Sequence, residues 1–204
     1  RYLVRSRGLG DVYKRQVTFS INESDAITAV SQNLRTETYN SFSIEKEIEV
    51  IYNFVDVKRF DKKPLDAFRK VLAPNGERII THASNFRKVK RVNDIIQVFA
   101  KINKVIPSKL LMVGDGPERP GAEELCRALN VCDDVRFLGK QQEMEEILAI
   151  SDLFMLTSEY ESFGLSALEA MAAGVPVLSS NAGGIPEINI HGQTGYMANI
   201  GDIE

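Results

Sequence analysis

Two acidic residues, Glu161 and Glu169, stand eight positions apart, on either side of the tripeptide Phe163-Gly164-Leu165. Carboxylates accept hydrogen bonds from hydroxyl groups, so such a pair suits a ligand that contains sugars. If both residues were helical, the second would lie within roughly 80° of the first and about 12 Å further along the helix. The two side chains could then reach opposite ends of an elongated ligand. The alternative is that Glu161 is a solvated loop residue and Glu169 a surface residue of an amphipathic helix.

The residues around this pair predict the elements that position it. Apolar residues 153–156 indicate a buried strand, and apolar residues recur at helical spacing between 165 and 172. Ser162 is a candidate N-cap for that helix, and Gly174 is a candidate C-terminal stop. The chain would thus pass from a strand to a helix N-terminus at the carboxyl end of a sheet. Unpaired N–H groups and the helix dipole favour an anion there, such as the phosphates of a ligand.

Strand and helix patterns alternate along the rest of the chain. Strands are predicted at 78–83, 109–113, 135–138, 153–156 and 175–179, and helices at 66–72, 92–105, 121–129, 144–150 and 186–190. This alternation predicts an α/β fold with a doubly wound parallel sheet covered on both faces. Residues 24–31 and 48–52 predict two further short strands, with a helical stretch at 33–39 between them.

The segment from Glu161 to Leu165, followed by Glu169, resembles the E-x7-E signature of the retaining GT-B glycosyltransferases. The resemblance extends from residue 17 to residue 202. Residues 48–56 and 84–91 resemble one branch of that family in particular, the bacterial N-acetyl-α-D-glucosaminyl L-malate synthases of bacillithiol biosynthesis. The resemblance implies the C-terminal Rossmann-like domain of a GT-B fold, preceded by the tail of a second, truncated domain.

The resemblance also implies roles for the residues of the signature. Glu161 and the backbone amides of Phe163, Gly164 and Leu165 would hold the transferring sugar. Glu169 would hold the ribose hydroxyls of the donor. Sequence position alone is compatible with these roles but does not require them.

The resemblance also implies a phosphate site, which is completed by Asn85 and Lys90 in the segment after the first predicted strand of the larger domain. Lys90 matches a lysine that binds the donor diphosphate in the wider family, whereas Asn85 stands where the family has an arginine. An amide lacks the charge of a guanidinium but can still donate a hydrogen bond to a phosphate oxygen. Glu161 and Lys90 are therefore the predicted catalytic residues. Without the resemblance, Lys90 would be interpreted as a solvated surface residue.

Two other strand ends are predicted to contribute backbone contacts. Gly114 and Gly116 follow a strand, where glycines let a ligand approach the backbone or simply form a tight turn. They are not a dinucleotide fingerprint, because the third glycine is missing. The resemblance implies that Gly114 lies along the nucleotide and that Leu138 and Gly139 read the uracil edge. Read without it, Leu138 and Gly139 are core and turn residues.

The two histidines are predicted to be non-catalytic. His82 lies in a predicted strand and His191 in a predicted turn, far apart in the sequence. Neither has a serine, cysteine or metal-ligand partner at a spacing that suggests catalysis.

The implied reaction is transfer of N-acetylglucosamine from UDP-N-acetylglucosamine to L-malate, with retention and without a metal ion. The implied partners are a nucleotide-sugar donor, which is a substrate rather than a cofactor, and a small hydroxy-acid acceptor. One alternative is another retaining UDP- or GDP-sugar transferase of cell-envelope or thiol biosynthesis, such as one directed to inositol. Another is a non-catalytic nucleotide-binding module. A NAD-dependent dehydrogenase would fit the fold, but its glycine fingerprint is absent.

Composition excludes several classes of function. A net charge of −3 gives no electrostatic case for binding nucleic acid or an anionic membrane. No apolar run approaches the ~20 residues of a transmembrane helix, and no signal peptide is evident. Cys126 and Cys132 lack C-x-x-C spacing and nearby histidines, so neither a disulfide nor a metal site is expected. The reducing cytoplasm is the predicted location.

The sequence predicts three segments of different character. Residues 1–16 carry five basic residues against one acidic residue and have no helical or strand period, so they resemble a cloning or sequencing-adapter scar. A basic targeting arm would need an apolar region that is missing. Residues 17–56 are predicted to end an N-terminal acceptor-side domain and its linker. Residues 57–204 are predicted to form a nucleotide-sugar-binding domain that is C-terminally incomplete, so weak donor binding and no turnover are expected of the isolated chain.

Overall fold

The computed structural model describes residues 10–63 and 66–204, and the chain divides into two compact units. The first unit runs to Asn53, and the second runs from Phe54 to Glu204. Each unit contains its own sheet, so each is described by itself.

The N-terminal unit consists of two helices and a pair of very short strands. Helix α1 spans Asp11–Asn22 and α2 spans Gln32–Ser41, while β1 (Thr28–Ala29) pairs in parallel with β2 (Glu49–Val50). Ser31 caps α2, because its hydroxyl accepts a hydrogen bond from the backbone N–H of Leu34 at 3.0 Å. The two predicted strands and the helix between them are present, although each strand is shorter than predicted.

Helix α1 shows that one prediction was wrong. Residues 1–16 were expected to lack a helical period, yet α1 includes residues 11–16. No side chain from Val12 to Asn22 is buried, and Val12 and Phe19 are 71% and 68% exposed. A helix without a buried stripe has no amphipathic pattern, so periodicity could not find it. Residues 1–9 lie outside the described residues, and the scar interpretation stays a prediction.

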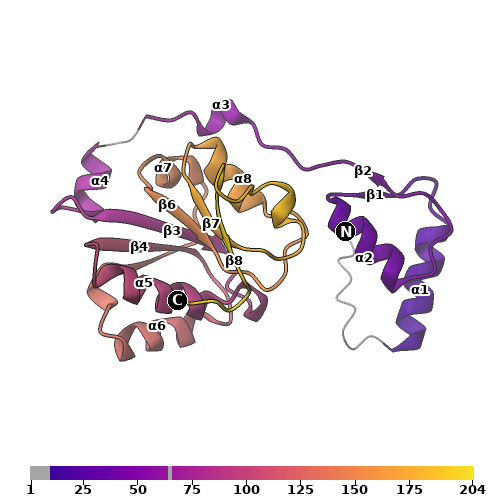
Figure 1. The fold of residues 1–204 in the computed structure, drawn as a ribbon, viewed down its shortest axis with the longest axis horizontal. Helices are drawn as coiled ribbons and strands as arrows, with labels where there is room; N and C mark the ends of the chain where they lie inside the picture. Colours follow the sequence, from indigo (N-terminus) through magenta and orange to yellow (C-terminus); the bar gives the residue numbers. More distant parts are fainter. Residues whose placement is uncertain (1–9, 64–65) are drawn as a thin grey trace. The chain divides into compact units, whose positions relative to one another are not determined.

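The larger unit is organised around a six-stranded sheet in which every paired strand is parallel (Figure 1). The order of its strands is β5-β4-β3-β6-β7-β8. They are β3 (Arg78–Ser84), β4 (Ser108–Gly114), β5 (Val135–Gly139), β6 (Leu153–Leu156), β7 (Val177–Ser180) and β8 (Gly195–Ala198). The five predicted strands of this unit correspond to β3 to β7. Strand β8 was not predicted, because its four residues carry no run of buried apolar side chains.

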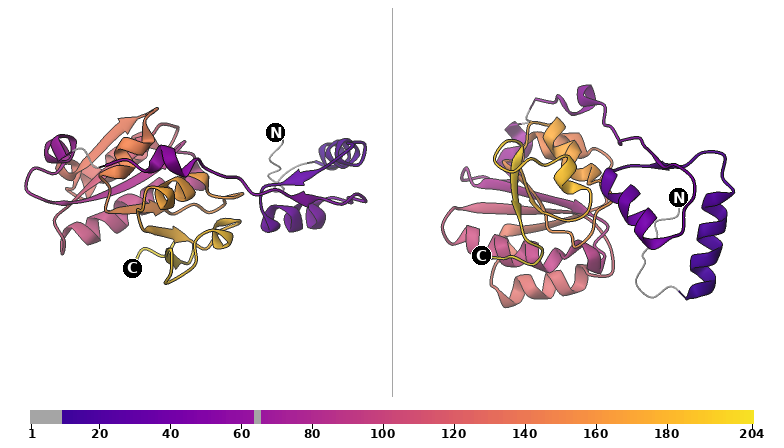
Figure 2. Two further views of the ribbon diagram at one scale, coloured as in Figure 1. Left: turned by 90° about the horizontal axis from the view of Figure 1, so that it is seen from above. Right: turned by 45° about the vertical axis from the view of Figure 1, so that its right-hand side comes forward.

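Helices cover both faces of this sheet, as the views in Figures 1 and 2 show. The helices are α3 (Val57–Phe60), α4 (Asp66–Leu72), α5 (Val92–Asn103), α6 (Arg119–Ala128), α7 (Met144–Ala149) and α8 (Leu165–Ala172), with 3-10 turns at Lys88–Lys90, Cys132–Asp134 and Ile185–Glu187. Ile80 and Leu110 pack in one core with α5 and α6, whereas Ile79 and Leu111 pack in another with α4 and α7. Because both faces are buried, the central strands are continuous apolar runs, which is why they could be predicted.

None of the described helices is long and apolar enough to span a bilayer. The longest, α1 and α5, have 12 residues each, whereas a transmembrane helix needs about 20.

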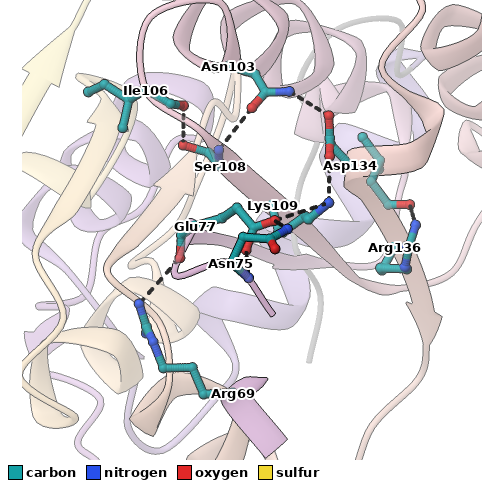
Figure 3. Close-up of polar contacts among 10 residues, drawn as sticks. Arg69, Asn75, Glu77, Asn103, Ile106, Ser108, Lys109, Asp134 and Arg136 are labelled. Carbon is teal, nitrogen blue, oxygen red and sulfur yellow. Dashed lines mark hydrogen bonds and ion pairs between the residues drawn. The ribbon is translucent and has the colours of Figure 1, made fainter. Parts of the chain in front are cut away.

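A polar network lies beside the amino ends of β3, β4 and β5, at the opposite end of the sheet from the loops described below (Figure 3). Lys109 is its centre. The ammonium of Lys109 lies 2.6 Å from Asp134 Oδ1 and 3.7 Å from Glu77 Oε1. Asn103 donates to Asp134 Oδ2 at 2.7 Å, and Asn75 donates to Glu77 through its backbone and its side chain. A hydrogen bond from its own backbone N–H holds the pKa of Glu77 below its ordinary value against the effect of burial, and the hydrogen bonds from Asn75 and the charge of Lys109 add to this effect.

Replacement of Lys109 by methionine tests the contribution of this network. The Lys109 side chain is only 14% exposed, so its loss leaves two carboxylates without their cation. We expect Lys109→Met to lower the free energy of unfolding by about 1–3 kcal/mol in urea denaturation. Lys101→Met is the control, because Lys101 pairs with Glu204 in an exposed ion pair and should change stability by less than ~0.5 kcal/mol. Equal losses of unfolding free energy in the two variants would show that the Lys109 network stabilises the fold no more than an exposed ion pair does.

Candidate functional site

The topology of the large sheet contains one switch point, between β3 and β6. From β3 the chain builds outward through β4 to β5, and from β6 it builds outward in the other direction through β7 to β8. The segments that leave the carboxyl ends of β3 and β6 therefore diverge from adjacent strands. Open parallel sheets bind their ligands at such a point.

An ion pair joins the two segments at the switch point. Lys90 Nζ contacts Glu161 Oε1, and the hydroxyl of Ser158 donates to the same oxygen at 2.9 Å. The Lys90 and Glu161 side chains are 18% and 13% exposed, so the pair is largely shielded from water. The structure thus brings together two predicted site residues that lie 71 positions apart in the sequence.

Backbone contacts hold the same two segments together. The N–H of Glu159 donates to the carbonyl of Val89 at 2.8 Å. The hydroxyl of Thr157 donates to the carbonyl of Arg91 at 3.1 Å. The position of the ion pair is therefore fixed by the main chain as well as by its own charges.

The N-terminus of α8 lies directly after Glu161, but it is not capped as predicted. Ser162 was expected to be the N-cap, whereas α8 begins at Leu165 and its N-cap is Gly164, with φ 93° and no capping side chain. A glycine is suited to this left-handed conformation. Because no side chain caps the helix, its positive end can act on an anion. The predicted stop is confirmed: Gly174 follows the last residues of α8 with φ 75°.

The backbone of Glu161 is fixed by the segment that follows β7. The carbonyl of Glu161 accepts a hydrogen bond from the N–H of Gly184 at 2.8 Å. A Cβ atom on Gly183 would lie 2.0 Å from the same carbonyl oxygen, so only glycine fits. The Ser180 hydroxyl donates to the carbonyl of Ser158 at 2.5 Å and ties down the start of the loop.

Glu169 occupies a different environment from Glu161. It is a partly buried residue of α8, whereas Glu161 lies in an irregular segment before the helix, so the two are not on one continuous helix. Burial raises the pKa of Glu169. The positive charge of Arg59 acts in the opposite direction, and the negative charge of Glu145 adds to the rise. Arg59 itself donates to Glu145 Oε2 at 3.1 Å.

Asn85 is exposed in the segment after β3, and Gly114 and Gly116 closely approach the backbone of residues 84 and 85. A Cβ atom on Gly114 would lie 1.8 Å from the carbonyl oxygen of Ser84, and one on Gly116 would lie 2.1 Å from that of Asn85. The glycines were predicted either to admit a ligand or to form a tight turn. In the structure, the backbone that both glycines approach closely is the protein's own.

Leu138 and Gly139 end β5, which is separated from β6 by β4 and β3. At the usual strand spacing this places them about 14 Å across the sheet from β6. The carbonyl of Leu138 accepts a hydrogen bond from the side chain of Gln141 at 2.5 Å. A ligand that touched both Glu161 and this strand end would have to be as long as a nucleoside diphosphate carrying a sugar.

One polar contact was missed by the sequence analysis. His82 was expected to have no serine partner at a useful spacing, but its Nε2 lies 2.8 Å from the hydroxyl of Ser84 and its Nδ1 lies 2.9 Å from the carbonyl of Met155. Residues two apart on a strand lie on the same face, so strand periodicity could have suggested the pair. Burial lowers the pKa of His82 to about 4. The hydrogen bond to Met155 opposes this shift, and the positive charge of Lys90 adds a smaller decrease.

Comparison with known proteins matches this unit to an established family. The family described as "Glycosyl transferases group 1" matches residues 65–204. N-acetyl-alpha-D-glucosaminyl L-malate synthase of Bacillus anthracis is 48% identical over 187 residues, which are 91% of this chain and 49% of the relative. Lipopolysaccharide core biosynthesis glycosyltransferase LpsE of Rhizobium meliloti is 30% identical over 199 residues, which are 96% of this chain and 55% of the relative.

A crystal structure gives the same match for the fold. The structure of HepE from Anabaena in complex with UDP and glucose superimposes with a TM-score of 0.86 and 26% identity, covering 96% of this chain and 55% of that one. The chain spans about half the length of the proteins that it matches. The α/β fold with a parallel sheet corresponds to the C-terminal, Rossmann-like half of GT-B structures, as predicted.

Substitution of Gly183 tests how the backbone of Glu161 is held. Gly183→Ala combines an unfavourable positive φ of 56° with a collision against the Glu161 carbonyl, so we expect a loss of about 2–4 kcal/mol in unfolding free energy. Gly192→Ala is the matched control. Gly192 also has a positive φ, of 78°, but nothing lies within 4 Å of its added Cβ, so about 1 kcal/mol is expected. Losses of the same size in urea denaturation would exclude the collision as the cause.

The raised pKa of Glu169 predicts the sign of a pH effect. The folded protein holds the Glu169 proton more tightly than the unfolded chain does. This residue therefore makes the free energy of unfolding fall as the pH rises above 4.5, the ordinary pKa of a glutamate. Glu169→Gln removes that effect and should raise the free energy of unfolding at pH 7 by about 0.5–1 kcal/mol. Urea denaturation between pH 4 and pH 8 measures it. A variant that is less stable than the wild type throughout this range would contradict the sign.

Proposed function

This chain belongs to the group 1 glycosyltransferases, and from that membership we propose that it forms the donor-binding part of an enzyme that transfers N-acetylglucosamine from UDP-N-acetylglucosamine to L-malate. The proposed reaction proceeds with retention and without a metal ion. Support for this donor and acceptor comes from the 48% identity to N-acetyl-alpha-D-glucosaminyl L-malate synthase. The complex of HepE with UDP and glucose supports a uridine nucleotide.

The observation that carries the proposed chemistry is the ion pair of Lys90 and Glu161 at the switch point, beside the N-terminus of α8. A cation and a helix N-terminus both stabilise phosphate, and a carboxylate accepts hydrogen bonds from sugar hydroxyls. These are the three properties that a nucleotide-sugar site needs at the bond between phosphate and sugar.

In the proposed mechanism, the ion pair is exchanged when the donor binds. The diphosphate replaces Glu161 as the partner of Lys90, and Glu161 turns to the hydroxyls of the sugar. As the anomeric bond breaks, negative charge develops on the leaving diphosphate. Lys90, the amides of residues 163–165 and the dipole of α8 would stabilise that charge, with a hydrogen bond from Asn85.

The rest of the donor would extend across the carboxyl ends of the strands. Glu169 would accept hydrogen bonds from the ribose hydroxyls. Gly114 would lie along the nucleotide, and the backbone of Leu138 and Gly139 would contact the uracil edge. The spacing of about 14 Å between the ends of β6 and β5 suits this extended arrangement.

A second candidate is a related transferase with a different acceptor. It is favoured by the 30% identity to LpsE, which covers 96% of this chain. The protein encoded by the complete parent gene should be incubated with UDP-N-acetylglucosamine and either L-malate or inositol, and the release of UDP measured. Release that depends on malate supports the first candidate. Release with inositol but not malate supports the second, and no release with any acceptor leaves a nucleotide-binding module.

Replacement of Lys90 tests the phosphate role directly. We expect Lys90→Ala to weaken the binding of UDP to this chain by about 10–100-fold, because a hydrogen bond to a charged group is lost. Lys88→Ala is the control, since Lys88 lies in the same 3-10 turn but is exposed. Isothermal titration calorimetry at two salt concentrations measures both. The proposal fails if the two variants bind UDP equally well.

A further inference from the structure

We infer that His82 is a positioning residue of the proposed nucleotide site. With hydrogen on Nδ1, it joins the segment carrying Asn85 to β6, the strand that precedes Glu161. This inference rests on the proposed function, because it concerns the arrangement of the same site. His82 touches no predicted substrate atom. It acts through Ser84 and Phe86.

The tautomer follows from the partners of the ring. Nδ1 lies 2.9 Å from the carbonyl oxygen of Met155, which can only accept, so Nδ1 carries the hydrogen. The Ser84 oxygen accepts from the N–H of Phe86 at 3.3 Å and lies 2.8 Å from Nε2. The hydroxyl hydrogen of Ser84 is then free to be donated to Nε2. His82 is fully buried, and burial lowers its pKa to about 4, so the ring is neutral at pH 7.

The bond to Met155 lies where the main-chain ladder between β3 and β6 stops. Backbone register pairs join these strands at Ile80 with Leu153 and at Thr81 with Phe154. Beyond them β3 continues to pair only with β4, as far as Ser84. The imidazole of His82 therefore supplies the next connection between the two strands, at the switch point itself.

The other side of the ring controls the conformation of the segment after β3. Phe86 has φ 37°, a positive value that non-glycine residues adopt at an energetic cost. It is held there by three contacts: its buried ring stacks on His82 with 6.0 Å between centroids, its N–H donates to Ser84, and its carbonyl accepts from Glu118 N at 3.0 Å. This turn buries Phe86 and leaves the preceding residue, Asn85, exposed.

If His82 were only a core residue, loss of its contacts would change the free energy of unfolding but not UDP binding. The positioning role adds a second effect, because loss of the Ser84 hydrogen bonds should let the strained turn at Phe86 relax and move Asn85. The chain offers a matched buried contact without that link. The hydroxyl of Thr81, one residue before His82, lies 2.6 Å from the hydroxyl of Ser151.

The experiment compares UDP binding and unfolding free energy in four forms of this chain: the wild type, Ser84→Ala, Ser84→Thr and Thr81→Val. We expect Ser84→Ala to weaken UDP binding by about 3–10-fold, the effect of losing a neutral hydrogen bond. Ser84→Thr keeps the hydroxyl and should bind within about twofold of the wild type. Thr81→Val should lose a similar amount of stability while binding UDP as the wild type does.

Nitrogen-15 NMR of the imidazoles supplies a readout that does not depend on the ligand, with His82→Asn identifying the His82 signals. A neutral ring with hydrogen on Nδ1 at pH 7 supports the inference, and a protonated ring or hydrogen on Nε2 overturns it. Equal UDP affinities for Ser84→Ala and Thr81→Val also overturn it. If the wild-type chain binds no UDP, the proposed function fails separately. In that case the link between the segments after β3 and β6 is tested by the NMR signals alone. A shift of the backbone amide signals of residues 157–161 in Ser84→Ala supports it, and no shift overturns it.

Discussion

The site depends on one constraint of topology, which is that β3 and β6 are neighbours although the chain between them builds two further strands. Strands β4 and β5 extend the sheet from one edge of β3, and β6 pairs with the other edge, so the strands after β6 can extend the sheet only in the opposite direction. The segments after β3 and β6 are thus the two that diverge from adjacent strands. Lys90 and Glu161 meet for this reason and not because of any local sequence signal.

The ion pair with Glu161 neutralises the charge of Lys90 in the absence of a ligand. A lysine that is largely shielded from water is costly, and this cost would apply to Lys90 in the proposed diphosphate site when no ligand is bound, unless something neutralises its charge. Glu161 does so, while Ser158 satisfies the same carboxylate oxygen. In the proposed reaction the ligand must compete with Glu161, so part of its binding energy is used to separate the pair. The carboxylate that is released is the one that the sugar requires, which limits that loss.

The sequence was sufficient for the elements but not for their exact limits or contacts. Strands β3 to β7 were predicted because burial on both faces makes them apolar runs, and α5 because its apolar residues recur at helical spacing. Strand β8 and helix α1 lack such patterns. Ser162 has the composition of an N-cap, yet a glycine with positive φ starts α8 two residues later, since the backbone of Glu161 is already fixed by Gly183 and Gly184. The pairing of His82 with Met155 depends on strand order, which no local pattern encodes.

Close backbone contacts contribute to the shape of the site, and this separates part of its geometry from its chemistry. The carbonyls of Ser84, Asn85 and Glu161 each lie where a Cβ atom on a facing glycine could not fit. Such contacts are independent of the side chains at positions 85 and 161. A change of the side chain at position 85 is therefore expected to alter charge and hydrogen bonding more than the position of the backbone. Differences in donor preference among relatives of this fold would then be expected in exposed side chains such as Asn85, while the facing glycines preserve the backbone positions from which those side chains act.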